Sequence, residues 1–91
     1  MYDKLDRMYW TYVLELEKES YYIGKSKKES ISSRLKDHFS NKGSIATRKR
    51  NPQKVIEIEK YDCEKALTRK YINKYGKNRV KGYAWCQTTD W

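Results

Sequence analysis

Alternation of apolar and polar positions predicts three β-strands. Residues 10–16 form a run of β-branched, aromatic and aliphatic side chains, and residues 21–24 resume it after the polar break at residues 17–20. Two such runs with a short break between them are typical of a β-hairpin. Residues 54–60 again mix apolar and charged positions and predict a half-buried third strand.

A helical period follows the hairpin. Residues 28–40 place apolar and aromatic side chains at helical spacing, which predicts an inward face formed by Ile31, Leu35, His38 and Phe39. We expect Gly43 to take a left-handed conformation that ends this helix. The basic segment at residues 44–51, which precedes Pro52, predicts a loop or one short helical turn.

A second helical period covers residues 62–75. Asp62 suits an N-cap, Gly76 suits a stop, and one stripe runs through Cys63, Leu67, Tyr71 and Tyr75. The tail at residues 77–91 contains two tryptophans, and we expect it to pack back over the body. The order strand, strand, helix, strand, helix predicts one α+β domain over residues 1–91, with a small three-stranded antiparallel sheet flanked by helices.

Charge adds a partner class to this picture. The chain has a formal net charge of +9, from 21 Lys and Arg against 12 Asp and Glu. Residues 25–51 hold nine basic residues against two acids, and residues 65–81 hold seven basic residues and no acid. Two basic blocks on a small domain favour a polyanion partner, with a merely solvated surface as the alternative. No stretch pairs a basic face with a broad apolar one, so we expect no membrane partner.

The two cysteines do not indicate a disulfide framework. Cys63 and Cys86 lack metal-ligand spacing, and His38, the one histidine, does not complete a zinc site. Reduced thiols and the lack of an apolar targeting segment predict a cytoplasmic or nuclear protein rather than a secreted one.

Several motifs together resemble the GIY-YIG nuclease family. Trp10-Thr11-Tyr12 lies on the first predicted strand, and Tyr22-Ile23-Gly24 lies on the second, ten residues later. Arg34 and His38 follow as Arg-x-x-x-His on the first helix, and the basic segment Ser44-Ile45-Ala46-Thr47-Arg48 precedes the third strand. Lys74-Tyr75-Gly76 and Val80-Lys81-Gly82 are similar to a compact branch of that family. The resemblance extends over residues 10–87.

The resemblance implies hydrolysis of nucleic-acid phosphodiesters, here of DNA, with Mg²⁺ or Mn²⁺ as cofactor. In that family two tyrosines and a basic residue surround the attacking water, and a glutamate holds one divalent ion. The physical requirements agree, because the transition state accumulates negative charge on the phosphate oxygens. A catalyst therefore needs fixed positive charge and an oriented nucleophile.

Three residues carry this expectation most directly. Arg34 presents a planar fork of donors that matches two phosphate oxygens, with a surface ion pair to Asp37 or Glu29 as the alternative. Tyr12 is the candidate general base, which requires nearby cations such as Lys25 or Arg34 to favour its ionised form. The alternative is a structural hairpin ring. Tyr22 would hold water or phosphate, whereas alternation sends Tyr21 to the opposite face.

Other candidate positions have closer alternatives. His38 is assigned to proton transfer or phosphate contact, or else to a satisfied half-buried position. Gly24 suits close approach of a substrate backbone, or simply ends a strand. Lys25 and Arg48 are expected to contact phosphate. Gly24-Lys25-Ser26 also matches the end of a phosphate-binding P-loop, but Glu19 stands where that loop requires glycine.

This sequence departs from the family pattern at the metal ligand. The expected glutamate falls on Thr68 or Lys70, and neither replaces a carboxylate for a hard cation. Glu64, one turn before Thr68, is therefore assigned as the metal ligand, with stabilisation of the first helical turn as the alternative. Such domains often have an asparagine near their end, and this sequence has Ala84 at the corresponding position.

Two functions remain open at this level. The first is a metal-dependent DNA endonuclease that uses Tyr12, Tyr22, Arg34 and His38, with a metal at Glu64. The second is a catalytically inactive relative that binds DNA or serves as an interaction module. An RNA-directed version is a weaker third, because tyrosines also stack on single-stranded bases. The small surface predicts reliance on a homodimer or a partner subunit.

Overall fold

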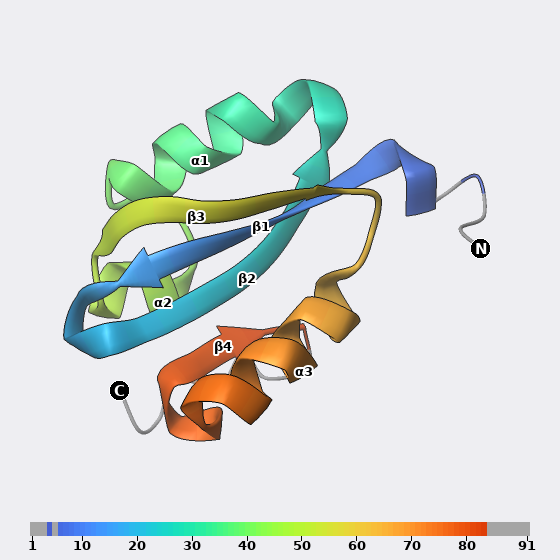
Figure 1. The fold of residues 1–91 in the computed structure, drawn as a ribbon. Coiled ribbons are helices and arrows are strands. Elements are labelled where there is room, and N and C mark those ends of the chain that lie inside the picture. Colours follow the sequence, from blue (N-terminus) through green and yellow to red (C-terminus); the bar gives the residue numbers. More distant parts are fainter. Residues whose placement is uncertain (1–3, 5, 84–91) are drawn as a thin grey trace.

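One four-stranded sheet organises the molecule. The computed structural model describes residue 4 and residues 6–83, and its sheet has the order β3-β1-β2-β4 (Figure 1). β1 (Tyr9–Leu16) pairs antiparallel with both β2 (Ser20–Lys27) and β3 (Pro52–Lys60), whereas β4 (Val80–Gly82) runs parallel to β2. The α+β class and the hairpin are confirmed.

The prediction of a purely antiparallel, three-stranded sheet is wrong. β4 comes from the tail and is three residues long, so it is too short to show the alternation that marks a strand in sequence. Its place at the edge depends on contact with β2, which starts 60 residues earlier in the chain. The chain after residue 83, including the tail tryptophans Trp85 and Trp91, lies outside the described residues.

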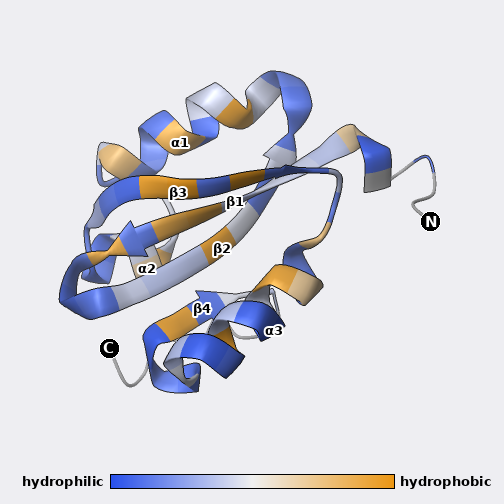
Figure 2. Ribbon diagram, viewed as in Figure 1, coloured by the Kyte–Doolittle hydropathy of each residue, from blue (hydrophilic) through white to orange (hydrophobic). Residues whose placement is uncertain are grey.

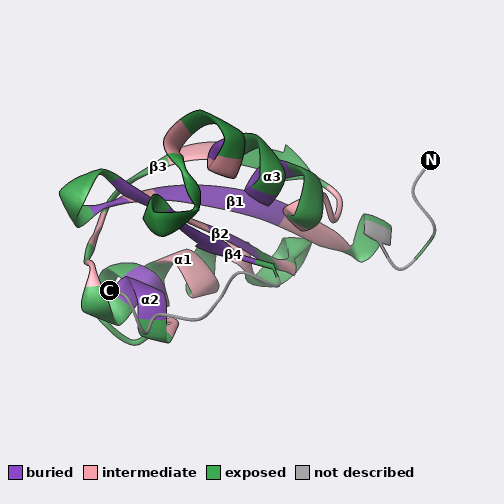
Figure 3. Ribbon diagram, turned by 90° about the horizontal axis from the view of Figure 1, so that it is seen from below, coloured by how far each residue is buried: buried purple, intermediate pink, exposed green. Residues whose placement is uncertain are grey.

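The helices cover both faces of the sheet. The turn η3 (Lys28–Ser30) leads into α1 (Ile31–Phe39), and α1 and α2 (Ile45–Lys49) lie on one face. α3 (Glu64–Tyr75) lies on the other face, against β2 and β4 (Figures 1 and 3). Three more short 3₁₀ turns complete the described chain: η1 (Asp6–Met8), η2 (Glu17–Glu19) and η4 (Lys77–Arg79).

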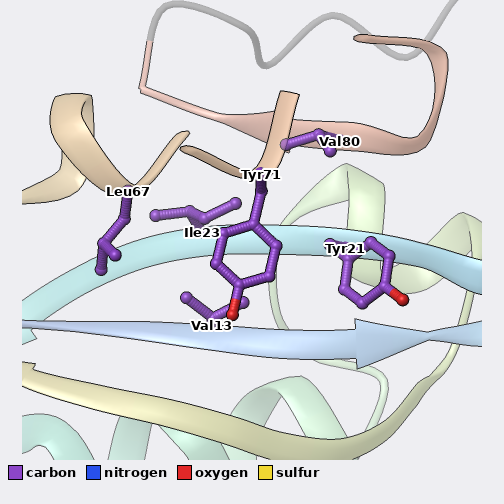
Figure 4. Packing of buried hydrophobic residues seen from close by; sticks show 6 residues of the cluster. All are labelled: Val13, Tyr21, Ile23, Leu67, Tyr71 and Val80. Atoms are coloured by element: carbon purple, nitrogen blue, oxygen red, sulfur yellow. The ribbon is translucent and has the colours of Figure 1, made fainter. Parts of the chain in front are cut away.

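Strand alternation divides the hairpin between two interiors. Tyr12, Leu14 and Leu16 of β1 are buried toward α1, where Ile31 and Leu35 pack against them. Side chains of the opposite parity point toward α3, in a cluster of Val13, Tyr21, Ile23, Leu67, Tyr71 and Val80 (Figure 4). Figure 2 shows apolar stretches within β1, β2 and β3, while α3 is largely hydrophilic. Only one side of α3 therefore contributes to the core.

Local helix predictions are partly confirmed. Ile31, Leu35 and His38 face inward, but Phe39 is 46% exposed. The reason is geometric: with 3.6 residues per turn, Phe39 lies about 100° around the helix from His38. The left-handed residue after α1 is Asn41, with φ of 62°, rather than Gly43. Asparagine tolerates this conformation better than most side chains.

The remaining elements follow the sequence closely. The basic segment before Pro52 forms the short helix α2, and Gly76 ends α3 with φ of 94°. α3 begins at Glu64 with Cys63 at the capping position, so the predicted cap at Asp62 is displaced by one residue. Asp62 still serves the helix start, because its Oδ1 accepts from the Glu64 amide at 3.3 Å. No helix in the described part of the chain is long and apolar enough to span a membrane.

Candidate active site

Three aromatic rings from separate elements meet on the α1 face of the sheet. Tyr12 of β1 and Tyr22 of β2 have ring centroids 6.4 Å apart, and the His38 ring of α1 lies 5.5 Å from Tyr12 and 5.3 Å from Tyr22. Tyr21 points to the opposite face, into the α3 cluster, as alternation predicts. The structure therefore brings together the two hairpin tyrosines and the helix histidine.

A short hydrogen bond joins Tyr12 to His38. The Tyr12 hydroxyl oxygen lies 2.6 Å from His38 Nε2, and both side chains are almost fully buried, with exposures of 1% and 0%. On the other side of the imidazole, His38 Nδ1 lies 3.0 Å from Thr47 Oγ1 of α2. His38 is therefore held at both nitrogens, which makes it a satisfied buried histidine that also contacts a candidate catalytic tyrosine.

Arg34 acts on both members of this pair. Its positive charge lowers the pKa of Tyr12 and the pKa of His38, although burial is the larger influence on each. Within the described part of the chain, no ion pair joins Arg34 to Asp37 or Glu29. The guanidinium is thus associated with the two rings rather than with the carboxylates of its own segment.

Burial decides the protonation states of the pair. It raises the pKa of Tyr12 well above its ordinary value, and the nearby Tyr22 raises it further, while Arg34 opposes both. Arg34 does favour the Tyr12 phenolate, as action as a general base requires, but in the protein without substrate the loss of water outweighs its charge. Burial also lowers the pKa of His38 to about 4, with Arg34 as the second cause, so the imidazole is neutral at pH 7.

The structure gives a reason for glycine at position 24 that differs from the two predicted ones. Gly24 lies within β2, opposite Tyr12, so it does not end a strand. A Cβ atom at this position would lie 2.6 Å from the Tyr12 hydroxyl and 2.9 Å from the Tyr22 ring. The absence of a side chain therefore makes room for the two tyrosines, and the space beside Gly24 is filled by the protein itself.

A charged group lies where α3 begins. Lys25 of β2 forms an ion pair with Asp62 at 2.7 Å, and hydrogen bonding to Asp62 raises the pKa of Lys25. Glu64, the first residue of α3, is half-buried, and burial raises its pKa while Lys25 opposes this effect. The Tyr83 backbone amide donates to the Glu64 carboxylate. Phosphate contact by Lys25 would therefore compete with an existing carboxylate partner.

Glu64 is also connected electrostatically to the tyrosine site. A negative charge at Glu64 raises the pKa of Tyr12, which places the carboxylate within electrostatic reach of the phenol. Thr68 is buried, and its hydroxyl has no hydrogen-bond partner within the part of the chain that the structure describes, whereas Lys70 is exposed and 3.7 Å from Glu57. Among the described residues, no three His, Cys, Asp or Glu side chains gather as a ready ligand set.

Two further residues were not singled out from sequence. Thr47 is fully buried beside His38, although the sequence alone indicated no role for it within the basic segment at residues 44–48. Lys81 of β4 is 5% exposed and lies beside Tyr22 in the parallel register. Arg48, the predicted phosphate contact, is exposed on α2 next to Thr47, and Ala84 lies outside the described residues. Tertiary contacts identify both residues: the packing of α2 against α1 for Thr47 and the pairing of β4 with β2 for Lys81.

Comparison with known families agrees with this arrangement. The family model described as the GIY-YIG catalytic domain matches residues 8–84. The chain belongs to the GIY-YIG family. The match includes every element from β1 to β4 and all residues of the site, so the resemblance carried by the two tripeptides and the Arg-x-x-x-His helix is confirmed, and with it membership of a family of nucleases. No curated protein and no solved structure matches the chain.

Proposed function

We propose that this GIY-YIG domain is a metal-dependent DNA endonuclease that hydrolyses phosphodiester bonds at the Tyr12–His38 pair. The observation that carries the proposal is the 2.6 Å contact between the Tyr12 hydroxyl and His38 Nε2, beside Arg34 and Tyr22. A phenol that touches a neutral imidazole can pass its proton on at the moment when it receives one from water.

The proton movements balance in one step. Water attacks phosphorus and gives a proton to the Tyr12 oxygen, while the Tyr12 proton moves to His38 Nε2 and leaves an imidazolium. The bond from phosphorus to the leaving oxygen breaks, and that oxygen takes a proton from solvent. Tyr12 thus acts as general base with His38 as the proton acceptor behind it, and Tyr22, whose ring lies 6.4 Å from that of Tyr12, orients the water.

Substrate charge makes this transfer easier. In the protein alone, burial and Arg34 both disfavour an imidazolium at His38. A bound phosphodiester would bring negative charge next to Arg34 and offset its effect on the two rings. The guanidinium would then hold phosphate oxygens through its paired N–H groups. The site therefore becomes competent as a base when the anionic substrate is present.

Glu64 fits a hard divalent cation of the Mg²⁺ class. Such ions commonly take one or two protein carboxylates and complete their shell with water and substrate phosphate. Glu64 supplies one half-buried carboxylate within electrostatic reach of Tyr12, and the Asp62 carboxylate lies close enough to raise its pKa. A bound Mg²⁺ or Mn²⁺ would neutralise charge developing on the phosphate and leaving group. Thr68, one of the two positions where the family glutamate is expected, supplies a hydroxyl and no carboxylate.

DNA is the partner that the charge supports best. Arg48 is exposed on α2 beside the site, and Lys25 can exchange Asp62 for a phosphate oxygen. Each phosphate neutralised by such residues releases counterions, so binding should weaken steeply as salt rises. These contacts are to the backbone and carry no sequence preference by themselves.

The test is cleavage of plasmid, single-stranded and branched DNA with Mg²⁺, with Mn²⁺ and with chelator. We expect metal-dependent nicking that is lost in Tyr12→Phe and Arg34→Ala. Lys74→Ala, on the exposed side of α3, serves as the matched surface control. Cleavage by Tyr12→Phe at the parental rate would remove the proposed base. Salt-dependent binding without any cleavage would instead identify a catalytically inactive DNA-binding relative.

The metal assignment has a separate readout. Titration of the protein with Mn²⁺ alone, followed by calorimetry, should show one weak site that disappears in Glu64→Gln. Asp62→Asn should weaken the site less, because Asp62 is ion-paired with Lys25. Unchanged Mn²⁺ binding in Glu64→Gln would exclude Glu64 as the ligand, whatever the rate of cleavage.

A further inference from the structure

We infer that Thr47 and Gly43 are positioning residues, which fix His38 in the tautomer with its proton on Nδ1 and its lone pair on Nε2, toward the Tyr12 hydroxyl. The catalytic meaning of this inference rests on the proposed nuclease function, but the tautomer itself does not. A neutral histidine has one donor and one acceptor nitrogen, and its surroundings decide which is which.

The hydrogen bonds on the α2 side give the direction. The Thr47 hydroxyl donates to the Ser44 carbonyl oxygen at 3.1 Å, and a carbonyl oxygen can only accept. Because a hydroxyl has a single proton, Thr47 Oγ1 must then accept from His38 Nδ1, 3.0 Å away. Nδ1 is therefore the protonated nitrogen, and Nε2 is the acceptor.

The Tyr12 side gives the same answer independently. With Nε2 as acceptor, the buried Tyr12 hydroxyl donates to His38 over 2.6 Å and its oxygen remains open to the donors of Arg34. In the opposite tautomer, His38 and Arg34 would both donate to this oxygen, because a guanidinium has no acceptor. The Tyr12 proton would then lose the acceptor that Nε2 provides over 2.6 Å, in a buried site where an unmade hydrogen bond is costly.

Gly43 keeps the space in which this arrangement fits. A Cβ atom at Gly43 would overlap His38 Nδ1 and lie 2.8 Å from Thr47 Oγ1. The backbone of Gly43 is not in the left-handed region, so conformational freedom does not explain the glycine. What requires it is the close approach of the chain to the imidazole on the same side as the bond to Thr47.

Two helices, α1 and α2, and the loop between them therefore determine the protonation of one nitrogen, His38 Nδ1. α1 supplies the imidazole, the Ser44 side chain caps α2 by accepting from the Thr47 amide, and the same Thr47 places its hydroxyl against Nδ1. Thr47 has no exposed surface of its own. Its effect on cleavage acts through the lone pair that it leaves on Nε2 for the Tyr12 proton.

The direct test is the ¹⁵N spectrum of His38, which is unambiguous because the chain has one histidine. At pH 7 the parent should show a protonated Nδ1 and an unprotonated Nε2. Thr47→Val, which keeps the shape and removes the hydroxyl, should lose this preference, and Thr47→Ser should retain it. Gly43→Ala should disturb the same resonances. A protonated Nε2 in the parent, or an unchanged spectrum in Thr47→Val, would overturn the inference.

Cleavage provides the second readout. Thr47→Val should lower kcat by roughly 10- to 100-fold with little change in KM, as for other groups that orient a catalytic histidine. Thr47→Ser should recover most of the rate. A parental protein with the expected spectrum but no cleavage would refute the nuclease proposal and leave the tautomer assignment intact. A normal kcat in Thr47→Val, despite a changed spectrum, would show that the tautomer does not limit catalysis.

Discussion

Both faces of the sheet bury a tyrosine ring, but the two hydroxyls differ in their partners. On the α1 face, Tyr12 is 1% exposed and contacts the neutral His38. On the α3 face, Tyr71 is 8% exposed and its hydroxyl donates to the Glu57 carboxylate at 2.8 Å. Burial raises the pKa of both tyrosines above the ordinary range.

The partners decide what each hydroxyl can do. Burial alone would raise the pKa of Glu57, but hydrogen bonds with Tyr71 and Glu59 and the charge of Lys70 lower it overall, so the carboxylate accepts the Tyr71 hydrogen bond in its ionised form. His38 is neutral at pH 7 and holds a lone pair toward Tyr12. Burial by itself therefore does not distinguish a catalytic tyrosine from a structural one. The surroundings do, because Tyr12 lies beside Arg34 and Tyr22, whereas Tyr71 lies in the apolar cluster under α3.

The largest expected difference between the two faces is in cleavage. Tyr12→Phe should reduce the single-turnover rate about 10²- to 10⁴-fold, because general base catalysis is lost. Tyr71→Phe removes a hydrogen-bonded tyrosine hydroxyl on the other face and should leave the rate within about tenfold of the parent, since it has no part in the proton transfer. Rates measured on one plasmid substrate with Mg²⁺ make this comparison. Equal losses in both variants would show that the effect is not specific to the Tyr12 site.

The next difference concerns pH and stability. The pKa of His38 falls from its ordinary 6.5 to about 4 on folding, so the unfolded chain binds the additional proton in this window. Stability should therefore fall as pH drops from 6.5 to 4, by up to about 3 kcal/mol from this residue. Urea unfolding of the parent and of His38→Gln, which does not titrate, isolates the contribution. Parallel pH curves for the two proteins would contradict it.

A substitution on the α3 face should lower the free energy of unfolding more clearly than it lowers the cleavage rate. Tyr71→Phe removes a hydrogen bond to a charged, partly buried acceptor and should cost about 1.5–3 kcal/mol of unfolding free energy. A double-mutant cycle with Glu57→Gln should recover part of this loss as coupling, because the two residues share the bond. Additive losses would indicate that the hydroxyl packs against Glu57 without contributing through it.

The smallest expected difference is in DNA binding. Arg48→Ala on the α1 and α2 side should reduce the slope of log affinity against log salt by about 1, the amount for one phosphate contact. Lys74→Ala, exposed on α3 with its Nζ 5.3 Å from the Tyr75 ring centroid, should leave the slope unchanged. Fluorescence anisotropy across a salt series measures both. A reduced slope only in Lys74→Ala would place the DNA on the opposite face.

Local periodicity was sufficient for most of the elements. Alternation in the hairpin separates Tyr22 from Tyr21, and helical spacing puts Arg34 and His38 on the side of α1 that meets the sheet. These predictions succeed because side-chain direction within one strand or helix follows from backbone geometry alone. Phe39 shows the limit, since it stands at the edge of the helical stripe and is exposed.

The partners of those side chains were decided by tertiary structure. The sequence alone determined an α+β chain with two hairpin tyrosines, an arginine and a histidine at family spacing. The fold decided that β4 joins the sheet, that Gly24 and Gly43 yield space to Tyr12 and His38, and that Thr47 reaches Nδ1. It also decided that burial outweighs Arg34 in setting the pKa of Tyr12, because desolvation depends on every element that covers the ring. Contacts between distant segments, which set burial and hydrogen bonding, leave no periodic trace in the sequence.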